Sequence, residues 1–365
     1  MIARLAGPRW PGLLAFGCAV LSLALVPEGS TAAHIRVETL APGIVAFLRT
    51  EPPGLAFDSN SVAIINDDDV IVVDAQSSPD STREVLTALR AITSKPVSYV
   101  INTHAHFDHT IGNRVYKEAF PHVDVVAHER TRDDILHAGR ERLQQMLAHL
   151  PEMKTFFTDL LQKGQWVDGS PLNEEERASI TSDRMMAERY ESIPSGFDPV
   201  LPTITIEQRL MLRRGARTID VRFLGRGHTD GDLIVYLPED GVLMSGDLVV
   251  WPVPLVGSTS FPLDYATTLD ALGQIRAAII VPGHGPVFHD DAYLKQVTEL
   301  LTSLASQTRA AVARGETLEQ VRKSVNLDAL RDRFAGDSLV RRTLFSTYVS
   351  GPGIQRAYEQ AVAPH

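Results

Sequence analysis

The sequence predicts an α/β protein in which strands and helices are stacked in layers. Short apolar segments of strand length alternate with segments whose apolar residues recur at helical spacing. Several apolar segments end in polar clusters flanked by glycine, and open sheets carry their chemistry at such strand ends. The 365 residues are 44% hydrophobic and 22% charged, so the chain has enough apolar material for one large or two ordinary domains.

The first predicted elements follow one another as strands and one helix. Residues 61–75 (SVAIINDDDVIVVDA) are expected to form two strands around an acidic turn. A helix is expected at residues 80–92, with Ser78 or Asp80 as its N-cap. Four apolar residues share one face of that helix: Val85, Leu86, Leu89 and Ile92. Two more apolar strands are expected, at residues 97–102 and 123–128.

Residues 130–200 interrupt this alternation. They are rich in polar, helix-forming residues, and an acidic run at Glu174–Glu176 indicates a solvated helix face. We therefore expect a mostly helical insertion, which is either a lid over a site or a satellite bundle.

The second half of the chain predicts more strands and then helices. Residues 209–224 alternate around a turn at Gly215, and residues 233–247 turn at Asp240–Gly241, so both are expected to be hairpins. Residues 277–285 predict a buried strand. From residue 291 to the end, a helical extension is expected.

The N-terminus has the pattern of a secretory signal. Arg4 and Arg9 precede an apolar run at residues 12–26, and the small residues 30–33 (STAA) follow. We expect a signal peptide at residues 1–33, cleavage after Ala32 or Ala33, and export to the periplasm or medium; a retained anchor is the alternative. Because Cys18 is the only cysteine, the mature chain has no thiolate ligand.

The formal net charge is −10, and the sequence has no block of lysine or arginine. A nucleic-acid partner is therefore excluded, because it requires a basic surface. The expected partner is a small-molecule substrate, with no stable membrane span after signal cleavage.

Candidate metal ligands cluster in residues 102–113, NTHAHFDHTIGN, which follow a predicted strand. This stretch contributes His104, His106, Asp108 and His109. Three further candidates lie at later strand ends: His228 in GRGHTDGD, Asp247 in LMSGDLV and His284 in VPGHGP. Glycine beside each cluster allows sharp turns and close approach of the backbone.

These seven side chains divide into two sets. One metal ion would take His104, His106 and His228, the other Asp108, His109 and His284, and the two oxygens of Asp247 can bridge both ions. Imidazoles and carboxylates suit two Zn²⁺ ions per chain, while iron or manganese also fits because no thiolate is present. Water between two such ions loses a proton near neutral pH, and Asp108 is the candidate catalytic residue that would orient the resulting hydroxide.

The motif THAHFDH with the later His, Asp and His resembles the metallo-β-lactamase superfamily over roughly residues 36–290. The resemblance implies a four-layer αβ/βα sandwich with the metals at one edge. The domain at residues 34–290 would carry the helical insertion, and residues 291–365 the C-terminal extension. It also implies that Asp74 supports the metal ligands, although an ordinary strand-end carboxylate is an equal alternative.

The ligand set predicts an exported metal-dependent hydrolase that attacks an ester, lactone, thioester or amide carbonyl. The resemblance makes β-lactamase activity an alternative, although the β-lactamases of this superfamily carry Cys or Ser where this chain has Asp247. A mononuclear iron oxygenase of the same fold that oxidises sulfur compounds is a second alternative.

Other polar and aromatic residues favour structural roles. His128 is expected to be a structural histidine. Trp251 and Phe261 are expected to pack rather than to line a substrate pocket. Four further histidines are expected on the surface: His122, His137, His149 and His289.

Overall fold

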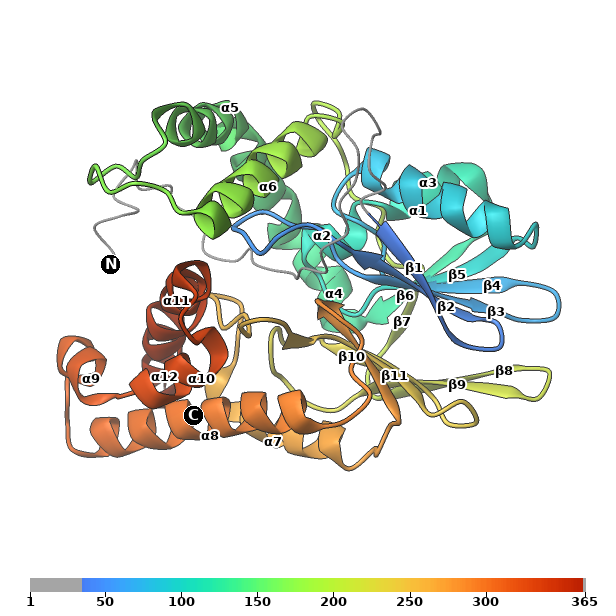
Figure 1. Cartoon of the computed structure of the whole chain (residues 1–365). Helices are drawn as coiled ribbons and strands as arrows, with labels where there is room; N and C mark the ends of the chain where they lie inside the picture. Colours follow the sequence, from blue (N-terminus) through green and yellow to red (C-terminus); the bar gives the residue numbers. More distant parts are fainter. Residues whose placement is uncertain (1–34, 364–365) are drawn as a thin grey trace.

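The computed structural model describes residues 35–363, so the predicted signal peptide at residues 1–33 lies outside the described residues. Two β-sheets form the centre of the molecule (Figure 1). The first sheet contains seven strands in chain order: β1 (Ile35–Ala41), β2 (Ile44–Arg49), β3 (Ser61–Ile65), β4 (Val70–Val73), β5 (Val97–Ile101), β6 (Asp124–His128) and β7 (Ile204–Ile206). The second sheet has the order β12 (Ile279–His284), β11 (Val242–Val250), β10 (Leu233–Leu237), β9 (Arg217–Phe223) and β8 (Arg209–Arg214).

The strand pairing brings the motif-bearing ends together. Strands β4 to β7 are parallel, and so are β11 and β12, whereas the other neighbours are antiparallel. Val73 of β4 lies opposite Ile101 of β5, so Asp74 and Asn102 leave the sheet side by side. The carboxyl ends of parallel strands meet at one edge, which places the first histidine motif beside Asp74.

Helices cover the outer face of each sheet, and a buried apolar layer joins the sheets. Helices α1 (Pro79–Ile92) and α3 (Asn113–Ala119) pack on the first sheet, and α7 (Pro262–Gly273) and α8 (Ala292–Ala313) pack on the second (Figure 1). Between the sheets, Ile64 and Val73 share one core cluster with Val235 and Val281. The predicted four-layer αβ/βα sandwich is thus confirmed.

The predicted helix at residues 80–92 is observed as α1, with one error in its buried face. Ser78 is the N-cap, because its side chain accepts a hydrogen bond from the backbone N–H of Ser81. Val85 and Leu89 are buried as expected, but the side chain of Ile92 is 46% exposed. Ile92 is the last residue of the helix, where the chain already leaves the sheet.

The insertion after β6 is helical, as predicted. It consists of α4 (Glu129–Asp134), the π-helical turn η2 (Ile135–Gly139), α5 (Arg140–Lys163) and α6 (Glu174–Tyr190). The expectation of a solvated acidic face was wrong for Glu176, which is buried. Glu176 and the N-cap residue Asn173 form a capping box at the start of α6, so this glutamate fixes the helix end.

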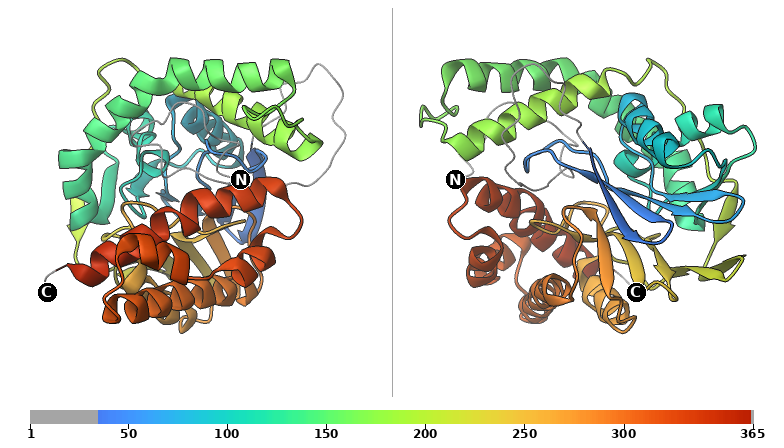
Figure 2. Two further views of the ribbon diagram at one scale, coloured as in Figure 1. Left: turned by 90° about the vertical axis from the view of Figure 1, so that its left-hand side faces the viewer. Right: turned by 45° about the vertical axis from the view of Figure 1, so that its right-hand side comes forward.

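The C-terminal extension is also helical. After α8 it contains α9 (Leu318–Ser324), α10 (Asp328–Ala335), α11 (Leu339–Phe345), the π-helical turn η3 (Ser346–Ser350) and α12 (Pro352–Val362). The insertion and the extension lie at the same end of the sandwich, on opposite sides of it (Figure 2). They meet where the hydroxyl of Ser338, the N-cap of α11, donates to Oε1 of Glu175 at 2.6 Å. Within residues 35–363, no helix has the length and apolarity required to cross a membrane.

Candidate metal centre

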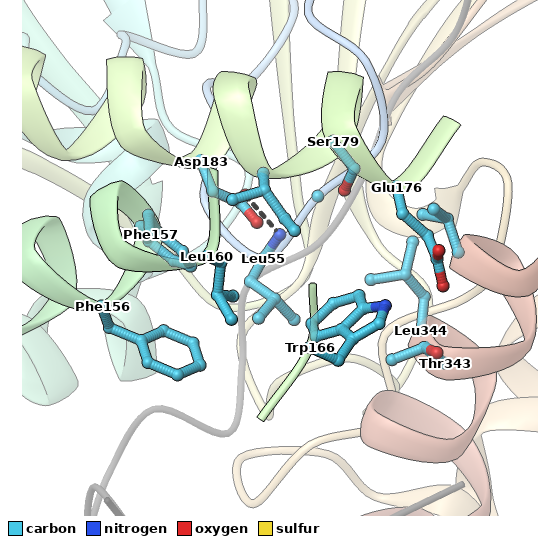
Figure 3. A pocket seen from close by; sticks show the side chains of 13 residues that line it. Leu55, Phe156, Phe157, Leu160, Trp166, Glu176, Ser179, Asp183, Thr343 and Leu344 are labelled. Carbon is cyan, nitrogen blue, oxygen red and sulfur yellow. Dashed lines mark hydrogen bonds between the residues drawn. The ribbon is translucent and has the colours of Figure 1, made fainter. Parts of the chain in front are cut away.

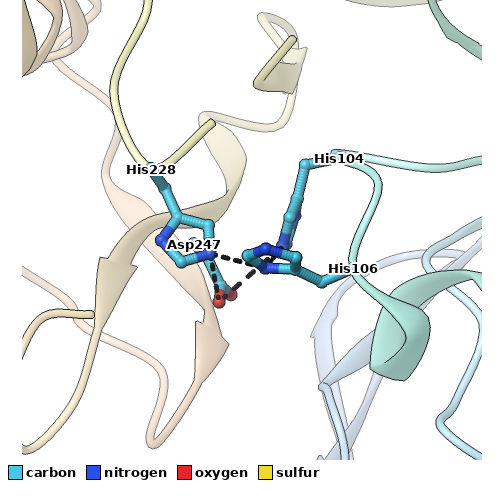
Figure 4. Close-up of side chains that lie close together, drawn as sticks. All are labelled: His104, His106, His228 and Asp247. Carbon is cyan, nitrogen blue, oxygen red and sulfur yellow. Dashed lines mark hydrogen bonds and ion pairs between the residues drawn. The ribbon is translucent and has the colours of Figure 1, made fainter. Parts of the chain in front are cut away.

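The structure brings all seven predicted ligands together at the edge of the sandwich. Their ligand atoms form two groups, each within 4.8 Å: His104, His106, His228 and Asp247 in one, and Asp108, His109 and His284 in the other. Figure 4 shows the first group, in which His104 and His106 meet His228 and Asp247 from the opposite side. Of the seven residues, six are buried and His106 is partly exposed.

Local backbone structure explains how these residues converge. His104 and His106 lie in the loop after β5, and Asp108 and His109 lie on the short helix α2 (Phe107–Thr110) that follows it. His228 comes from the loop between β9 and β10, and His284 is the last residue of β12.

Asp247 was expected at the end of a strand but lies inside β11, so this detail of the prediction was wrong. The register between β11 and β12 shifts on either side of Gly246, the residue before it. Gly246 has a φ of 52°, and a Cβ there would lie 2.6 Å from Cβ of Thr103. A glycine is therefore required at this irregularity, which turns the Asp247 side chain toward the ligands.

The carboxylate of Asp247 faces both groups. Its Oδ2 lies 3.4 Å from Nε2 of His228 and 3.9 Å from Nε2 of His104. Its Oδ1 lies 3.3 Å from Nε2 of His109 and 3.4 Å from Nε2 of His284. A Cβ on Gly283 would lie 1.9 Å from this Oδ1, so the β12 backbone approaches Asp247 as closely as only glycine permits.

Each imidazole makes a hydrogen bond through the ring nitrogen that points away from the centre. Nδ1 of His228 and of His284 donate to the carbonyls of Leu255 and Asp58, at 3.0 and 2.9 Å. Nδ1 of His104 contacts the Thr103 hydroxyl at 3.1 Å, and Nε2 of His106 contacts the Thr259 hydroxyl at 3.1 Å. The hydroxyls of Thr103 and Thr259 donate to Asp74 and to the His228 carbonyl, so they accept from the rings as the two carbonyls do. Nε2 of His104 and His228 and Nδ1 of His106 therefore present lone pairs inward.

The inward nitrogens have the spacing of metal ligands. Nδ1 of His106 lies 3.1 Å from Nε2 of His104 and 2.9 Å from Nε2 of His228. Lone pairs that face each other so closely repel unless a cation lies between them. Ligands on a tetrahedral ion at the usual zinc–nitrogen bond length are about 3.4 Å apart. The residues therefore fit a divalent metal ion.

Asp74 supports this centre from outside. Its Oδ2 lies 2.9 Å from Nδ1 of His109, and its two oxygens accept the backbone N–H and the hydroxyl of Thr103, each at 2.8 Å. Because Thr103 in turn contacts His104, Asp74 reaches one ligand of each group. The supporting role suggested for it is consistent with these contacts.

Electrostatics separates the two groups. Burial, reinforced by the neighbouring imidazoles, holds the pKa of His104 and His106 well below the ordinary value, and burial also lowers the pKa of His228. In the other group burial acts to lower the pKa of His284, but Asp247 and Asp108 together raise it to about 9. Burial opposes ionisation of Asp108 and Asp247, yet the adjacent imidazoles hold the pKa of both carboxyls well below the ordinary value.

Two carboxylate oxygens in the centre have no hydrogen-bond partner among the described residues. Oδ2 of Asp108 lies 3.1 Å from Nε2 of His284 and 3.3 Å from Nε2 of His109, but in poor hydrogen-bond geometry. Oδ1 of Asp247 is the other. Buried carboxylate oxygens are costly unless they are hydrogen-bonded or bind a metal ion, so their position supports a cation here as well.

A cavity of about 70 Å³ adjoins His106. The insertion provides much of its lining, with Ile135, Leu143 and Met146 as apolar residues and Arg142 as a charged one. Thr259, in the loop after β11, also lines the cavity. Arg142 is paired with Asp134, so its charge is partly offset. The insertion thus lines the space next to the centre.

Sequence reasoning missed the residues that orient the imidazoles from outside. Asp58 and Leu255 act through backbone carbonyls, which leave no signal in the side-chain sequence. Thr259 lies 31 positions after His228, with no spacing that would connect them. Thr103 could have been predicted to support a ligand, because it directly precedes His104 in the motif.

The residues expected to be structural are placed accordingly. Nε2 of His128 bonds the carbonyl of Glu207, and its Nδ1 accepts from the backbone N–H of Arg130 at the start of α4. Phe261 packs against the guanidinium groups of Arg226 and Arg356. Trp251 lies under Arg341, and neither aromatic ring lines the cavity beside His106.

Fold and site together define a protein of the metallo-hydrolase type with a His/Asp metal centre. A family model described as metallo-beta-lactamase superfamily matches residues 54–284. The chain belongs to the metallo-β-lactamase superfamily, as the sequence motif indicated. Members of this superfamily are mostly metal-dependent hydrolases.

One curated relative is a linear primary-alkylsulfatase of Pseudomonas sp. (strain ATCC 19151), which is 23% identical over 277 residues. The match covers 72% of this chain and 47% of the relative, so the chain spans about half the length of that protein. Solved structures with the same fold include VMB-1 (TM-score 0.50, 16% identity, 75% of this chain and 99% of that one). A metallo-β-lactamase from Pontibacter korlensis also matches (TM-score 0.49, 18% identity, 73% and 99%). These similarities concern the fold alone.

Proposed function

We propose that this chain is an exported hydrolase that uses two divalent metal ions, most simply zinc, to cleave an ester, lactone, thioester or amide bond of a small molecule. The position of Asp247 is the main support, because one carboxylate oxygen faces each group of histidines. Below, His104, His106 and His228 are called the three-histidine half-site, and Asp108, His109 and His284 the aspartate half-site. Asp247 is shared by both.

The chain's own residues have distinct roles in this scheme. Two bound divalent ions would supply Lewis acidity and a nucleophile derived from water. Asp247 would hold the half-sites together and offset their positive charge. Asp108 would orient the attacking water and pass its proton to the leaving group. The outer hydrogen bonds of the imidazoles keep their inward lone pairs oriented, so little reorganisation is needed when metal binds.

Metal content and a substrate panel test this proposal. About two zinc ions per purified chain, lost together with activity on chelation, is the expected result. The panel should contain an ester, a lactone, a thioester and a β-lactam. About one iron per chain, with oxygen consumption in the presence of a thiol or persulfide, would instead support the mononuclear oxygenase.

Hydrolysis of a sulfate ester is a second candidate. The curated relative named above is an alkylsulfatase, and Arg142 places a guanidinium in the cavity beside His106. Arginine suits oxyanion recognition because it carries five N–H donors, of which the pair with Asp134 uses two in Arg142. The apolar lining from Ile135, Leu143 and Met146 would suit the hydrocarbon part of such a substrate. Alkyl sulfates of several chain lengths should be added to the substrate panel. Their hydrolysis, compared with that of the carbonyl compounds, decides which class of substrate the protein cleaves.

A further inference from the structure

The loop between β2 and β3, residues 50–60, is held by side chains of helix α6 in the insertion. Oδ1 of Asp183 accepts the backbone N–H groups of Leu55 and Ala56, at 2.6 and 2.8 Å. The hydroxyl of Tyr190 donates to the carbonyl of Phe57 at 2.9 Å and accepts its N–H at 3.2 Å. Figure 3 shows the Asp183 carboxylate directed at the Leu55 backbone. Two residues of α6 thus bind three consecutive residues of the loop.

This contact is close and buried. Asp183 and Tyr190 are each 2% exposed. A Cβ on Gly54 would lie 2.2 Å from Oδ1 of Asp183, so the loop approaches as closely as a glycine allows. A small apolar cavity of about 30 Å³ adjoins the contact, and its lining includes Leu55, Phe157 of α5 and Leu344 of α11 (Figure 3). Burying a carboxyl without a cationic partner costs free energy, which the two amide hydrogen bonds partly offset.

The next residues of the same loop contact the aspartate half-site. The carbonyl of Asp58 accepts Nδ1–H of His284 at 2.9 Å. The Phe57 ring packs edge-on against the His284 ring, with 4.6 Å between centroids. The hydroxyl of Ser59 donates to the carbonyl of Asp108 at 2.7 Å. The loop therefore connects helix α6 to two of the three ligands of this half-site.

A second loop, residues 251–261, connects the C-terminal extension to the other half-site. The extension holds it through two hydrogen bonds, from Val256 N–H to the carbonyl of Tyr348 and from Nε of Arg356 to the carbonyl of Ser260, both at 3.0 Å. The loop in turn contacts the side chains of two ligands, while its first residue, Trp251, reaches the other half-site only through a backbone bond to the carbonyl of His284. Leu255 accepts Nδ1–H of His228, and the hydroxyl of Thr259 contacts Nε2 of His106.

We propose that the two helical additions are positioning elements for separate halves of the metal centre. Helix α6 holds the aspartate half-site through residues 50–60, and the C-terminal helices hold the three-histidine half-site through residues 251–261. This inference rests on the proposed metal centre and goes beyond the hydrolytic reaction. Asp183, Tyr190 and Arg356 are positioning residues, because they touch neither the centre nor the cavity beside it.

Conservative variants distinguish a loss of positioning at one half-site from a loss of overall protein stability. Tyr190→Phe removes the hydroxyl that binds Phe57, and Tyr116→Phe is its matched control, since the buried Tyr116 hydroxyl has no partner among the described residues. Asp183→Ala removes the acceptor oxygen, whereas Asp183→Asn keeps one and should restore binding. For the extension, Arg356→Ala is matched by Arg322→Ala, which loses a bond to the partly exposed Gln355 side chain.

The test is a titration of metal-free protein with Co²⁺, followed by absorption, because the spectrum depends on the ligand set. His284→Ala and His228→Ala identify which step belongs to which half-site. Tyr190→Phe and Asp183→Ala should lower the Co²⁺ affinity of the aspartate half-site about tenfold, and the affinity of the other binding step should stay unchanged. Tenfold is the lower end of the loss seen when a residue that supports a metal ligand is removed. Arg356→Ala should do the reverse, and both controls should match the wild type.

The outcomes are distinguishable. The proposal would be overturned if each variant lowered the Co²⁺ affinity of both binding steps equally. It would also be overturned if no variant changed the affinity of either step. Thermal unfolding of the metal-free variants shows whether a loss of affinity merely follows a loss of stability. If Tyr190→Phe fails to fold, the Asp183 pair gives the same comparison. Failure of the wild type to bind Co²⁺ at all would instead contradict the proposed function.

Discussion

Oδ2 of Asp74 lies 2.9 Å from Nδ1 of His109, and the same carboxylate accepts two hydrogen bonds from Thr103, which contacts His104. One acidic side chain thus orients a ligand in each half-site. Asp74 follows β4 with a φ of 59°, a left-handed conformation that costs free energy for a residue other than glycine. The hydrogen bonds of its side chain and the backbone bond from its N–H to the carbonyl of Ile101 hold it there.

Asp74→Asn should weaken metal binding about ten- to a hundredfold, as loss of a hydrogen-bonded carboxylate behind a histidine ligand usually does. The amide can replace only one carboxylate oxygen, so either the Thr103 backbone N–H, or both His109 and the Thr103 hydroxyl, lose their acceptor. The measurement is Zn²⁺ affinity by competition with a chelator. An affinity equal to that of the wild type would show that Asp74 is an ordinary strand-end carboxylate.

Asp247→Asn keeps the shape of the side chain and removes the charge shared by the two half-sites. Bound ions would then repel each other more strongly, so metal content should fall from about two toward about one per chain. Hydrolysis should fall at least about a hundredfold. Elemental analysis and kinetics measure the two effects. Asp240→Asn, in the turn between β10 and β11, is the control, and an unchanged metal content in the Asp247 variant would refute the two-metal scheme.

Arg142→Met should impair substrates that carry an anionic group and spare neutral ones. KM for the anionic substrate should rise about tenfold, because a hydrogen bond to a charged group contributes about 1.5–3 kcal/mol and Asp134 already offsets part of this charge. Metal content should not change. The measurement is kcat and KM for a matched anionic and neutral pair, and equal effects on both would assign Arg142 to the structure of the insertion.

Asp183→Asn should flatten the pH dependence of stability. Burial raises the pKa of Asp183 to about 7 from 3.8. Between these values the folded protein keeps a proton that the unfolded chain has lost, so the free energy of unfolding falls as pH rises from about 4 to 7. Over these three pH units, titration of Asp183 lowers the free energy of unfolding by at most about 4 kcal/mol.

Urea unfolding of the metal-free protein at pH 5 and pH 8 measures this effect. The wild type should lose more stability than the variant between the two pH values. Glu176, which lines the same cavity, is retained in both proteins and is therefore part of the common background. Parallel losses in the two proteins would show that Asp183 does not titrate in this range.

Export with removal of residues 1–33 stays a prediction from the sequence. Protein recovered from the cell envelope or medium should begin near Ala33 or His34. N-terminal sequencing gives the answer, and an intact Met1 in the cytosolic fraction would contradict export.

The seven candidate ligands could be named from the sequence because His104 to His109 lie within six positions and the other three follow glycine-flanked strand ends. The hairpins at Gly215 and Asp240–Gly241 were equally local and are confirmed. Asp247 was misplaced at a strand end, because the register shift at Gly246 depends on contact with Thr103 in the loop after β5. Ile92 was assigned to a buried face because helical spacing does not show where the sheet stops.

The sequence by itself determined the order of strands and helices, the layered fold and the identity of the ligands, since these follow from apolar periodicity and from residue type. The tertiary structure alone decided which atom of each ligand points inward, because the tautomers depend on distant partners such as the carbonyls of Asp58 and Leu255. It also decided the attachment of α6 to residues 50–60. That contact joins positions more than 120 residues apart through backbone groups, which carry no sequence signal.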